Sequence, residues 1–417
     1  MAVKPGYKLT EIGVIPEEWE VKPFGALFTF RNGVNADKNS YGQGVHFINV
    51  LEPITYSHIH GPEIQGQVTL PEPVFASYEV RLGDVLFNRT SETQEEVGLA
   101  ATYLGSKRVV FGGFVIRGRP MDESLDPVYS GYALRAPCIR SQIIPMGQGA
   151  IRANIAQSNL SLVVAPVPPL SEQRAIATAL SDADALLSAL ERLIAKKRDL
   201  KQAAMQQLLT GQTRLPGFQD DWEVKQLGDC LISRPDYGIN AAAVPFSDKL
   251  PSYIRITDIS VHGRFCPDPR VSVRAASAAQ YYLQTGDVVF ARTGASVGKS
   301  YLYEPGDGPL VFAGFLIRVR PNPSLLVPAF LAAYTTTQPY WNWVRLMSMR
   351  SGQPGINGNE YAQLPLSLPT LPEQTAIAAV LCDMDAELVA LEQRLVKTRA
   401  LKQGMMQELL TGRTRLL

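Results

Sequence analysis

The chain has 417 residues, of which 46% are hydrophobic and 19% charged, which suffices for two or three packed domains and excludes a disordered tail. The formal net charge is only +1, so bulk charge gives no support for nucleic-acid binding, and any DNA contact must come from local clusters. The sequence has no signal-peptide-like start, no run near the about 20 apolar residues of a membrane span and no Cys-x-x-Cys pair. We therefore expect a cytoplasmic protein with reduced cysteines that makes no membrane contact.

The first part of the chain predicts a globule followed by a long helix. Short β-type runs such as Val45–Val50 and Val109–Ile116 are punctuated by Gly and Pro, which indicates a compact α+β globule with an irregular sheet. From Glu172 to Leu209 there is neither Pro nor Gly, and good helix formers dominate. This stretch predicts one helix that ends before Gly211.

The second part predicts the same succession. Short β-type runs such as Tyr253–Ile256 and Val288–Phe290 come first, and a second predicted helix, Glu373–Leu410, follows them. The second helix differs from the first by containing Gly404, which costs about 1 kcal/mol relative to Ala.

An internal repeat relates the two parts. Leu170–Leu215 aligns without a gap to Leu371–Leu416 at an offset of 201 residues, and 28 of the 46 positions are identical. Shorter matches join Trp19–Lys22 to Trp222–Lys225, Gly83–Thr90 to Gly286–Thr293, and Phe114–Pro120 to Phe315–Pro321. Between these matches the two parts diverge, so one architecture carries two different surfaces. That pattern suits a protein that recognises two different targets in the same way.

The repeat divides the chain into four predicted segments: a first globule at 1–165, a first helical segment at 166–215, a second globule at 216–365 and a second helical segment at 366–417. Apolar residues with 4-3-4 spacing predict a coiled-coil seam at Ala183, Leu187, Leu190 and Ile194 in one helix and at Met384, Leu388, Leu391 and Leu395 in the other. A helix of about 38 residues spans about 57 Å. We therefore expect the two helices to pack antiparallel, with the globules at opposite ends. The alternative is that each helix only braces its own globule.

These residues resemble the specificity subunits of type I restriction–modification systems. The family signature is a Pro-rich lead into a Glu-Gln dipeptide, followed by a long helix that ends in Leu-Leu-Thr-Gly. Here it is carried by Val167–Gln173 with Leu208–Gly211, and again by Leu368–Gln374 with Leu409–Gly412. The opening Ile15–Trp19 and the Gly-Asp-Val runs at Gly83 and Gly286 are also typical, and the resemblance covers the whole chain.

The resemblance implies an α+β protein with two target-recognition domains in tandem repeat, separated by two long antiparallel coiled-coil helices and related by pseudo-twofold symmetry. Each domain would read one half of a bipartite site in double-stranded DNA. The helices would set the spacing and dock two methyltransferase subunits, with restriction subunits outside that core. The chain itself would be non-catalytic and bind no cofactor, while its partner subunits would use S-adenosylmethionine, ATP and Mg. A rigid spacer would fix the number of unread base pairs, because DNA rises about 3.4 Å per base pair.

Reading DNA needs side chains that match base edges and phosphates: Arg suits guanine, and Asn or Gln suits adenine. The repeated strand end offers Arg89, Thr90, Arg292, Thr293 and Lys299 as DNA contacts. Further candidates are Arg31, Asn32, Lys107 and Arg108 in the first part, and Arg255, Arg345, Arg350 and Gln353 in the second. The alternative for Arg89 and Arg292 is a structural pairing with a carboxylate such as Asp84 or Asp287. Arg117 and Arg318 are shared by divergent parts, which favours a role in the fold.

Two other functions compete with DNA recognition: a coiled-coil scaffold and a nucleotide-binding enzyme. The near-neutral charge favours a coiled-coil scaffold that reads no DNA. Gly294–Ser300 resembles a phosphate-binding P-loop, but three residues separate its glycines where the motif needs four.

The four histidines show no ligand spacing, so we expect no metal site. The basic run Lys196–Arg198 with Lys201 would face DNA, a partner subunit or solvent.

Overall fold

A computed structural model describes residues 3–149, 152–349 and 353–416, and the chain forms two compact units. The first unit comprises Met1–Glu191 and Arg394–Leu417, and the second comprises Arg192–Gln393. Each unit therefore contains one globule and one end of each long helix. The unit boundaries pass through both helices, so the four-segment division expected from the repeat stays a prediction.

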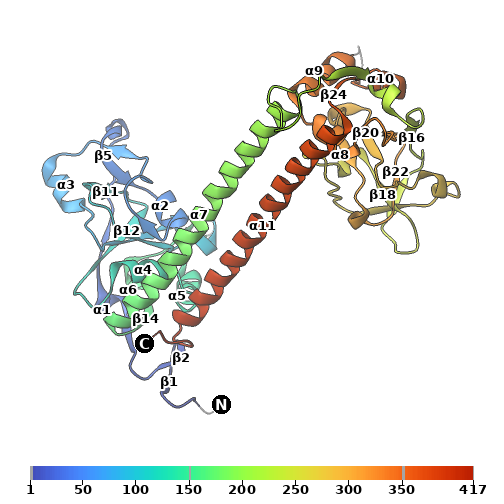
Figure 1. Ribbon diagram of the computed structural model, residues 1–417. Coiled ribbons are helices and arrows are strands. Elements are labelled where there is room, and N and C mark those ends of the chain that lie inside the picture. Colours follow the sequence, from blue (N-terminus) through green and yellow to red (C-terminus); the bar gives the residue numbers. More distant parts are fainter. Residues whose placement is uncertain (1–2, 150–151, 350–352, 417) are drawn as a thin grey trace. The chain divides into compact units, whose positions relative to one another are not determined.

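The two long helices are α7 (Leu170–Leu208) and α11 (Leu371–Leu409), each of 39 residues, coloured green and red in Figure 1. Their bounds lie within two residues of the predicted ones. Each helix is followed by a glycine with positive φ, Gly211 at +71° and Gly412 at +69°, a conformation that side chains with a Cβ rarely adopt. None of the helices in the described part of the chain combines the length and the apolar character of a membrane span.

Within each unit the ends of α7 and α11 run antiparallel and are joined by ion pairs. These pairs are Asp184–Lys402 and Glu191–Arg399 in the first unit, and Lys197–Glu387, Arg198–Glu392 and Lys201–Asp385 in the second. Most of the basic run on α7 thus faces acidic residues of α11. Pairs that solvent reaches contribute up to about 1 kcal/mol each, so these pairs fix the register of the helices more than they add stability.

The predicted seam lies partly in the interior. Leu190, Ile194 and Leu388 are buried. The other five predicted seam residues, Ala183, Leu187, Met384, Leu391 and Leu395, are half-buried. Their partners across the helix pair stay a prediction.

The first unit is built on a five-stranded sheet with a three-stranded sheet beside it. The strand order is β4 (Phe28–Asn32), β12 (Val115–Pro120), β8 (Val85–Asn88), β10 (Ala100–Tyr103) and β6 (His58–Ile59) in the larger sheet, and β11 (Val109–Phe111), β5 (Tyr41–Ile48) and β7 (Gln67–Val68) in the smaller. Two-stranded pairs are β1 (Tyr7–Thr10) with β2 (Gly13–Pro16), β3 (Glu20–Pro23) with β14 (Val164–Val167), and β9 (Thr90–Ser91) with β13 (Ala153–Asn154). The short helices are α1 (Phe24–Leu27), α2 (Leu51–Thr55), α3 (Glu72–Tyr78), α4 (Pro127–Ala133), α5 (Pro137–Ile143) and α6 (Gln157–Leu162).

The second unit has two four-stranded sheets. Their orders are β16 (Asp236–Tyr237), β23 (Leu316–Val319), β20 (Val288–Ala291) and β21 (Ser300–Leu302), and β17 (Ala243–Pro245), β19 (Val271–Val273), β18 (Ser252–Ile254) and β22 (Leu310–Phe312). The remaining elements are the pair β15 (Glu223–Gln226) with β24 (Pro365–Leu368) and the helices α8 (Pro328–Tyr334), α9 (Gln338–Met347) and α10 (Gly358–Ala362). The order β16-β23-β20-β21 has the same antiparallel pairings as β4-β12-β8-β10 of the first unit.

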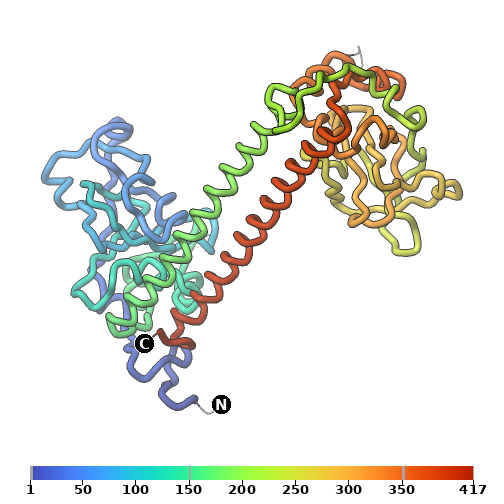
Figure 2. Tube along the Cα trace, viewed as in Figure 1, coloured from blue at the N-terminus to red at the C-terminus, as the bar shows by residue number. Residues whose placement is uncertain are grey.

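A buried glutamate at the start of α7 joins the two helices in the first unit. Arg415, beyond the end of α11, donates from Nε and Nη2 to the two carboxylate oxygens of Glu172 at 2.5 and 2.8 Å. The indole Nε1 of Trp19 donates to the same carboxylate at 2.8 Å. Nearby, the Tyr7 hydroxyl donates to the carbonyl of Gly412, so the N-terminal segment lies beside the end of α11 (Figure 2).

The second unit repeats this clasp. Arg214, beyond the end of α7, donates from Nε and Nη2 to the two oxygens of Glu373 at 2.6 Å each. The side chains of Glu172 and Glu373 are both 1% exposed. Each clasp therefore ties the first turn of one helix to the segment that follows the other.

The glutamine of each Glu-Gln dipeptide fixes the loop in front of a short helix. Gln173 accepts from the backbone N–H of Asp126, at the N-cap of α4, and donates to the carbonyl of Ser124. Gln374 accepts from the backbone N–H of Val327, at the N-cap of α8, and donates to the carbonyl of Leu325. The dipeptide thus connects each globule to its long helix.

We expect Arg415→Ala to destabilise the first unit by about 2 kcal/mol, because it leaves the Glu172 carboxylate buried without its cation. Thermal and urea unfolding of the full chain measure this loss. The matched control is Arg413→Ala, because Arg413 is exposed and reaches Glu408 only at 3.7 Å, so its loss should change little. Adding Glu172→Gln to Arg415→Ala should recover part of the stability. Equal effects of the two arginine variants would contradict the role given to the clasp.

Candidate nucleic-acid interface

In the first unit the candidate arginine at the end of β8 is held against a neighbouring turn. Arg89 donates from Nη1 to the carbonyl of Gly113 at 3.1 Å and from its backbone N–H to the carbonyl of Phe114 at 2.9 Å. The hydroxyl of the next residue, Thr90, donates to Oδ1 of Asn154 at 2.6 Å. Both side chains are half-buried, so Arg89 and Thr90 are held at the sheet edge and still reach the surface.

The second unit places its candidate arginine in the same way. Arg292 follows β20, and its Nη1 and backbone N–H donate to the carbonyls of Gly314 and Phe315 at 3.5 and 3.1 Å. Its guanidinium lies 4.9 Å from the centre of the Tyr237 ring. Thr293 forms a β-bridge with Gly355, as Thr90 pairs with Asn154. The two predicted strand ends therefore share one geometry.

The carboxylates considered as partners of these arginines bind other arginines. Asp84 pairs with Arg117 and Arg119, and Asp287 pairs with Arg318 and Arg320. Arg117 and Arg318 are buried, and they donate to the carbonyls of Glu79 and Tyr282. The hypothesis that Asp84 or Asp287 holds Arg89 or Arg292 is therefore wrong, and Arg117 and Arg318 have the contacts of residues that serve the fold.

Burial raises the pKa of the Asp287 carboxyl, and its contacts with Arg318 and Arg320 act in the opposite direction. In the first unit burial lowers the pKa of the Arg117 guanidinium, against the attraction of Asp84. Both groups lie in the interior, so the Arg117 guanidinium is poorly placed to meet a phosphate.

The other candidates of the first unit lie in two places. Asn32 is in register with Ile116 of β12, near the end of β8 that leads to Arg89. Lys107 and Arg108 follow β10, which runs antiparallel to β8, so they lie toward the beginning of that strand. Arg108 pairs with Glu72 at 2.5 Å and lies 3.9 Å from the centre of the Phe75 ring.

Arg31 is exposed, and its guanidinium lies 4.6 Å from the centre of the Tyr78 ring. Only Asn32 among these four candidates is therefore grouped with Arg89 and Thr90.

Two candidates of the second unit are held by local contacts. Arg255 follows β18 and pairs with the buried carboxylate of Asp258 at 2.7 Å, which offsets much of its charge. Lys299 donates from Nζ to the carbonyl of Ile259 at 3.3 Å. Each has a structural partner, and both keep some exposed surface.

The remaining candidates lie on both sides of a segment that the structure leaves undescribed. The amide nitrogen of Gln353 lies 3.1 Å from the place that a Cβ on Gly294 would occupy, so Gln353 belongs with Thr293 at the strand end. Arg345 is exposed near the end of α9. Arg350 falls outside the described residues.

A second matched motif, which is not among the candidates above, lies beside these strand ends. Gly33–Ala36 reads Gly-Val-Asn-Ala, and Gly238–Ala241 reads Gly-Ile-Asn-Ala. A Cβ on Gly113 would collide with the side chain of Asn35, whereas a Cβ on Gly314 would make an ordinary contact with the backbone of Asn240. The identical Asn at both places was a signal available in the sequence.

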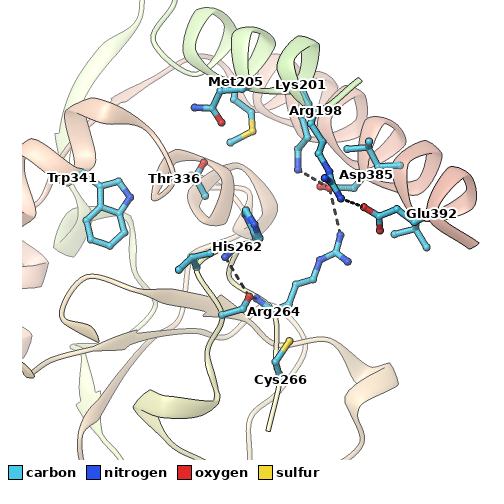
Figure 3. A pocket seen from close by; sticks show the side chains of 15 residues that line it. Arg198, Lys201, Met205, His262, Arg264, Cys266, Thr336, Trp341, Asp385 and Glu392 are labelled. Atoms are coloured by element: carbon cyan, nitrogen blue, oxygen red, sulfur yellow. Dashed lines mark hydrogen bonds and ion pairs between the residues drawn. The ribbon is translucent and has the colours of Figure 1, made fainter. Parts of the chain in front are cut away.

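The second unit also has a cavity of about 650 Å³ between the long helices and the loop around Arg264 (Figure 3). Its cations face carboxylates: Lys201 and Arg264 lie 2.6 and 3.5 Å from Asp385. The charges lining this cavity largely offset one another, so it is better suited to bracing the loop than to binding an anion. Among the described residues no group of three or more His, Cys, Asp or Glu side chains is placed to hold a metal ion.

Comparison with known proteins gives a consistent picture. Residues 219–398 match the family model described as "Type I restriction modification DNA specificity domain". A Methanocaldococcus jannaschii protein assigned as the type I restriction enzyme MjaX specificity subunit is 30% identical over 235 residues, which cover 54% of this chain and 55% of that protein. The chain thus spans about half the length of this relative. The EcoKI specificity subunit of Escherichia coli K12 is 24% identical over 400 residues, covering 88% of this chain and 82% of that protein.

Solved structures show the same fold at low identity. The S subunit of a type I restriction–modification system from M. genitalium has a TM-score of 0.55 and 17% identity, and the match covers 97% of this chain and 98% of that one. The HsdS subunit from Thermoanaerobacter tengcongensis has a TM-score of 0.54 and 20% identity, with coverages of 96% and 98%. The likeness therefore extends over nearly the whole chain and concerns the fold.

If the strand-end arginines contact DNA phosphates, Arg89→Ala and Arg292→Ala should each weaken duplex binding. Each variant should also reduce the slope of log K against log salt by about 1, because one phosphate contact is lost. Fluorescence anisotropy at several salt concentrations measures both quantities. The matched controls are Arg81→Ala and Arg274→Ala, which remove exposed arginines elsewhere in the same units. Unchanged slopes in both test variants would exclude phosphate contacts for these arginines.

Proposed function

We propose that the chain is a specificity subunit of the type I restriction–modification family, and that it is the DNA-reading subunit of such an enzyme. Each unit would supply one target-recognition domain, and each domain would read one half of a bipartite site in double-stranded DNA. The mixed helix-and-strand fold with its long helices and the matched specificity domain support this proposal.

The observation that carries the proposal is the same strand-end geometry with different neighbours. Arg89 and Arg292 are held by the same backbone contacts in the two units. In the other sheet of each unit, the residue that follows the matched strand differs: it is Asn49 after β5, and Arg255, which also pairs with Asp258, after β18. Asn suits adenine and Arg suits guanine, so equivalent frames would present different base-reading groups.

We further propose that the two recognition domains form a tandem repeat with pseudo-twofold symmetry and that the helices set the distance between them. The two clasps at Glu172 and Glu373 support a repeated attachment of globule to helix. The antiparallel ion pairs within each unit support a helix pair of fixed register. A helix pair of fixed register would hold the two recognition domains at a fixed separation, as reading two half-sites requires.

Exposed leucines on α7 support the docking of partner subunits. In the second unit Leu193 and Leu200 are seven residues apart and are 39% and 47% exposed, and in the first unit Leu186 is 41% exposed. An exposed leucine row at this spacing is suited to accept another helix. We propose that methyltransferase subunits dock on the long helices, two in the complete enzyme, and that restriction subunits bind outside that core.

The chemistry of the enzyme would belong to those partners. We propose that this chain is non-catalytic and binds no cofactor, whereas its partners use S-adenosylmethionine, ATP and Mg. The enzyme would act in the cytoplasm, where the host DNA lies.

A second candidate function is a coiled-coil scaffold that reads no DNA. The formal net charge of +1 favours it, because DNA-binding proteins commonly carry basic patches. Specific binding to duplex DNA with a steep salt dependence would exclude a pure scaffold.

Replacing Trp222–Leu364 with the corresponding domain of another specificity subunit tests the two-domain proposal. Only one half of the methylated motif should change, because the other domain and both helices are kept. Sequencing that detects modified adenines, in cells that also express the methyltransferase subunit, measures the motif. The reciprocal replacement of the first domain is the control and should change the other half. A change in both halves after one replacement would refute the proposal.

A further inference from the structure

Two exposed phenylalanines occupy equivalent places beside the strand-end arginines. Phe114 lies in the turn between β11 and β12, and Phe315 lies in the turn between β22 and β23. They are 53% and 58% exposed, whereas the residues on either side of each phenylalanine, apart from the half-buried Gly314, are buried. Large apolar side chains held in water at the same place in both units point to a binding role.

Backbone hydrogen bonds hold both turns rigid. In the first unit the N–H groups of Val115 and Gly113 donate to the carbonyls of Gly112 and Val34 at 2.9 Å each. In the second unit, Leu316 and Gly314 donate to Ala313 and Ile239 at 2.8 Å each. The backbone that carries each phenylalanine is therefore held in place before any ligand binds, which lowers the entropy cost of binding.

The surroundings of both rings suit DNA. The backbone N–H groups of Arg89 and Arg292 donate to the carbonyls of Phe114 and Phe315, and their guanidinium Nη1 atoms donate to the carbonyls of the preceding Gly113 and Gly314. The exposed Asn35 abuts Gly113, the residue before Phe114. Cationic and amide groups next to an exposed ring match phosphates and base edges on both sides of a base step.

The two units differ around these rings, and the rings are the same. Asn32 corresponds to Tyr237, and Asn154 to Gly355, by their matched backbone pairings. Asn49 and Arg255 each follow a strand that runs parallel to the strand before the phenylalanine turn. Residues that choose bases should differ between domains that read different sequences. A residue that is identical in both domains and exposed in both should instead do work that does not depend on the sequence.

We propose that Phe114 and Phe315 enter the duplex at the two half-sites and stack on a base at a step that each domain opens, whatever that base is. This inference rests on the proposed function. Every base has an aromatic face, so stacking tolerates any sequence, and Phe is among the side chains that proteins insert between base steps. The neighbouring arginine and asparagine would hold the flanking backbone and base edge.

The test uses the full chain in complex with its methyltransferase subunits and duplexes that carry 2-aminopurine in a half-site. Phe114→Ala and Phe315→Ala should each weaken binding by about 5- to 100-fold, the range for loss of one stacked base. The salt slope and the recognition sequence should stay unchanged, and the fluorescence rise that reports unstacking should disappear in the matching half-site. Phe114→Trp should retain both affinity and fluorescence.

The matched controls are Leu82→Ala and Ile232→Ala, which remove side chains that are 68% and 66% exposed elsewhere in the two units. They should leave binding unchanged. Thermal unfolding should be the same for all these variants, because the replaced side chains are exposed.

Three results would overturn the proposal and leave the proposed function standing. The first is unchanged affinity of both Phe variants, and the second is loss of the methyltransferase from the complex. The third is a relaxed preference for thymine at one position, which would mean that the ring reads a thymine methyl group. Failure of the wild-type complex to bind any duplex specifically would instead overturn the proposed function, and this inference with it.

Discussion

A buried carboxylate clasped by an arginine at each junction of globule and helix is the contact on which the structure depends. Glu172 and Glu373 stand in the first turns of α7 and α11, and the arginine that holds each one comes from the segment after the other helix. An unpaired carboxylate at 1% exposure would be strongly unfavourable, so the helix ends are bound in pairs. The adjoining Gln173 and Gln374 then fix the globule to the same turn. One short dipeptide therefore joins three segments in each unit.

This frame separates residues that are shared from residues that vary. Arg117 and Arg318 are shared and buried, and they bind the carboxylates at the beginning of β8 and β20. Phe114 and Phe315 are shared and exposed, and they lie next to Arg89 and Arg292. Asn49 and Arg255 occupy matched places and differ. A role in the buried interior explains why Arg117 and Arg318 are the same, and the choice of different bases would explain why Asn49 and Arg255 differ. Phe114 and Phe315 need a function that is common to both domains, and a DNA contact that does not depend on the base sequence would be one.

Much of the architecture follows from sequence, because it depends on local propensity and on the repeat. The absence of Pro and Gly over Glu172–Leu209 predicts α7 to within two residues, since nothing in that stretch interrupts helical hydrogen bonding. The fold role of Arg117 and Arg318 follows from their presence in two divergent domains. The clasp could not be predicted, because Arg415 and Glu172 lie 243 positions apart in the sequence. The sequence alone does not distinguish Arg415 from the other arginines as the partner of Glu172.

The candidate site was predicted only in part for the same reason. The strand-end position of Arg89 and Arg292 followed from the matched motifs, whereas their backbone partners depend on a turn that is distant in sequence. The proposed contact of Phe114 with DNA does not follow from the sequence, because an apolar residue in a β-type run is ordinarily interpreted as core and its exposure is a tertiary feature. The pairing of Arg255 with the nearby Asp258 is a local contact that the matched motifs do not indicate, and the assignment of Arg255 to DNA stays a prediction.

The most direct test of the central claim is the pattern of adenine methylation in a host that lacks its own. This chain would be expressed together with the methyltransferase subunit proposed as its partner, and the DNA would be sequenced by a method that detects modified adenines. The account predicts a split motif with a fixed unspecified gap that disappears when this chain is omitted. Methylation that is the same with and without the chain would contradict the account, because the chain would then not direct the enzyme to its site.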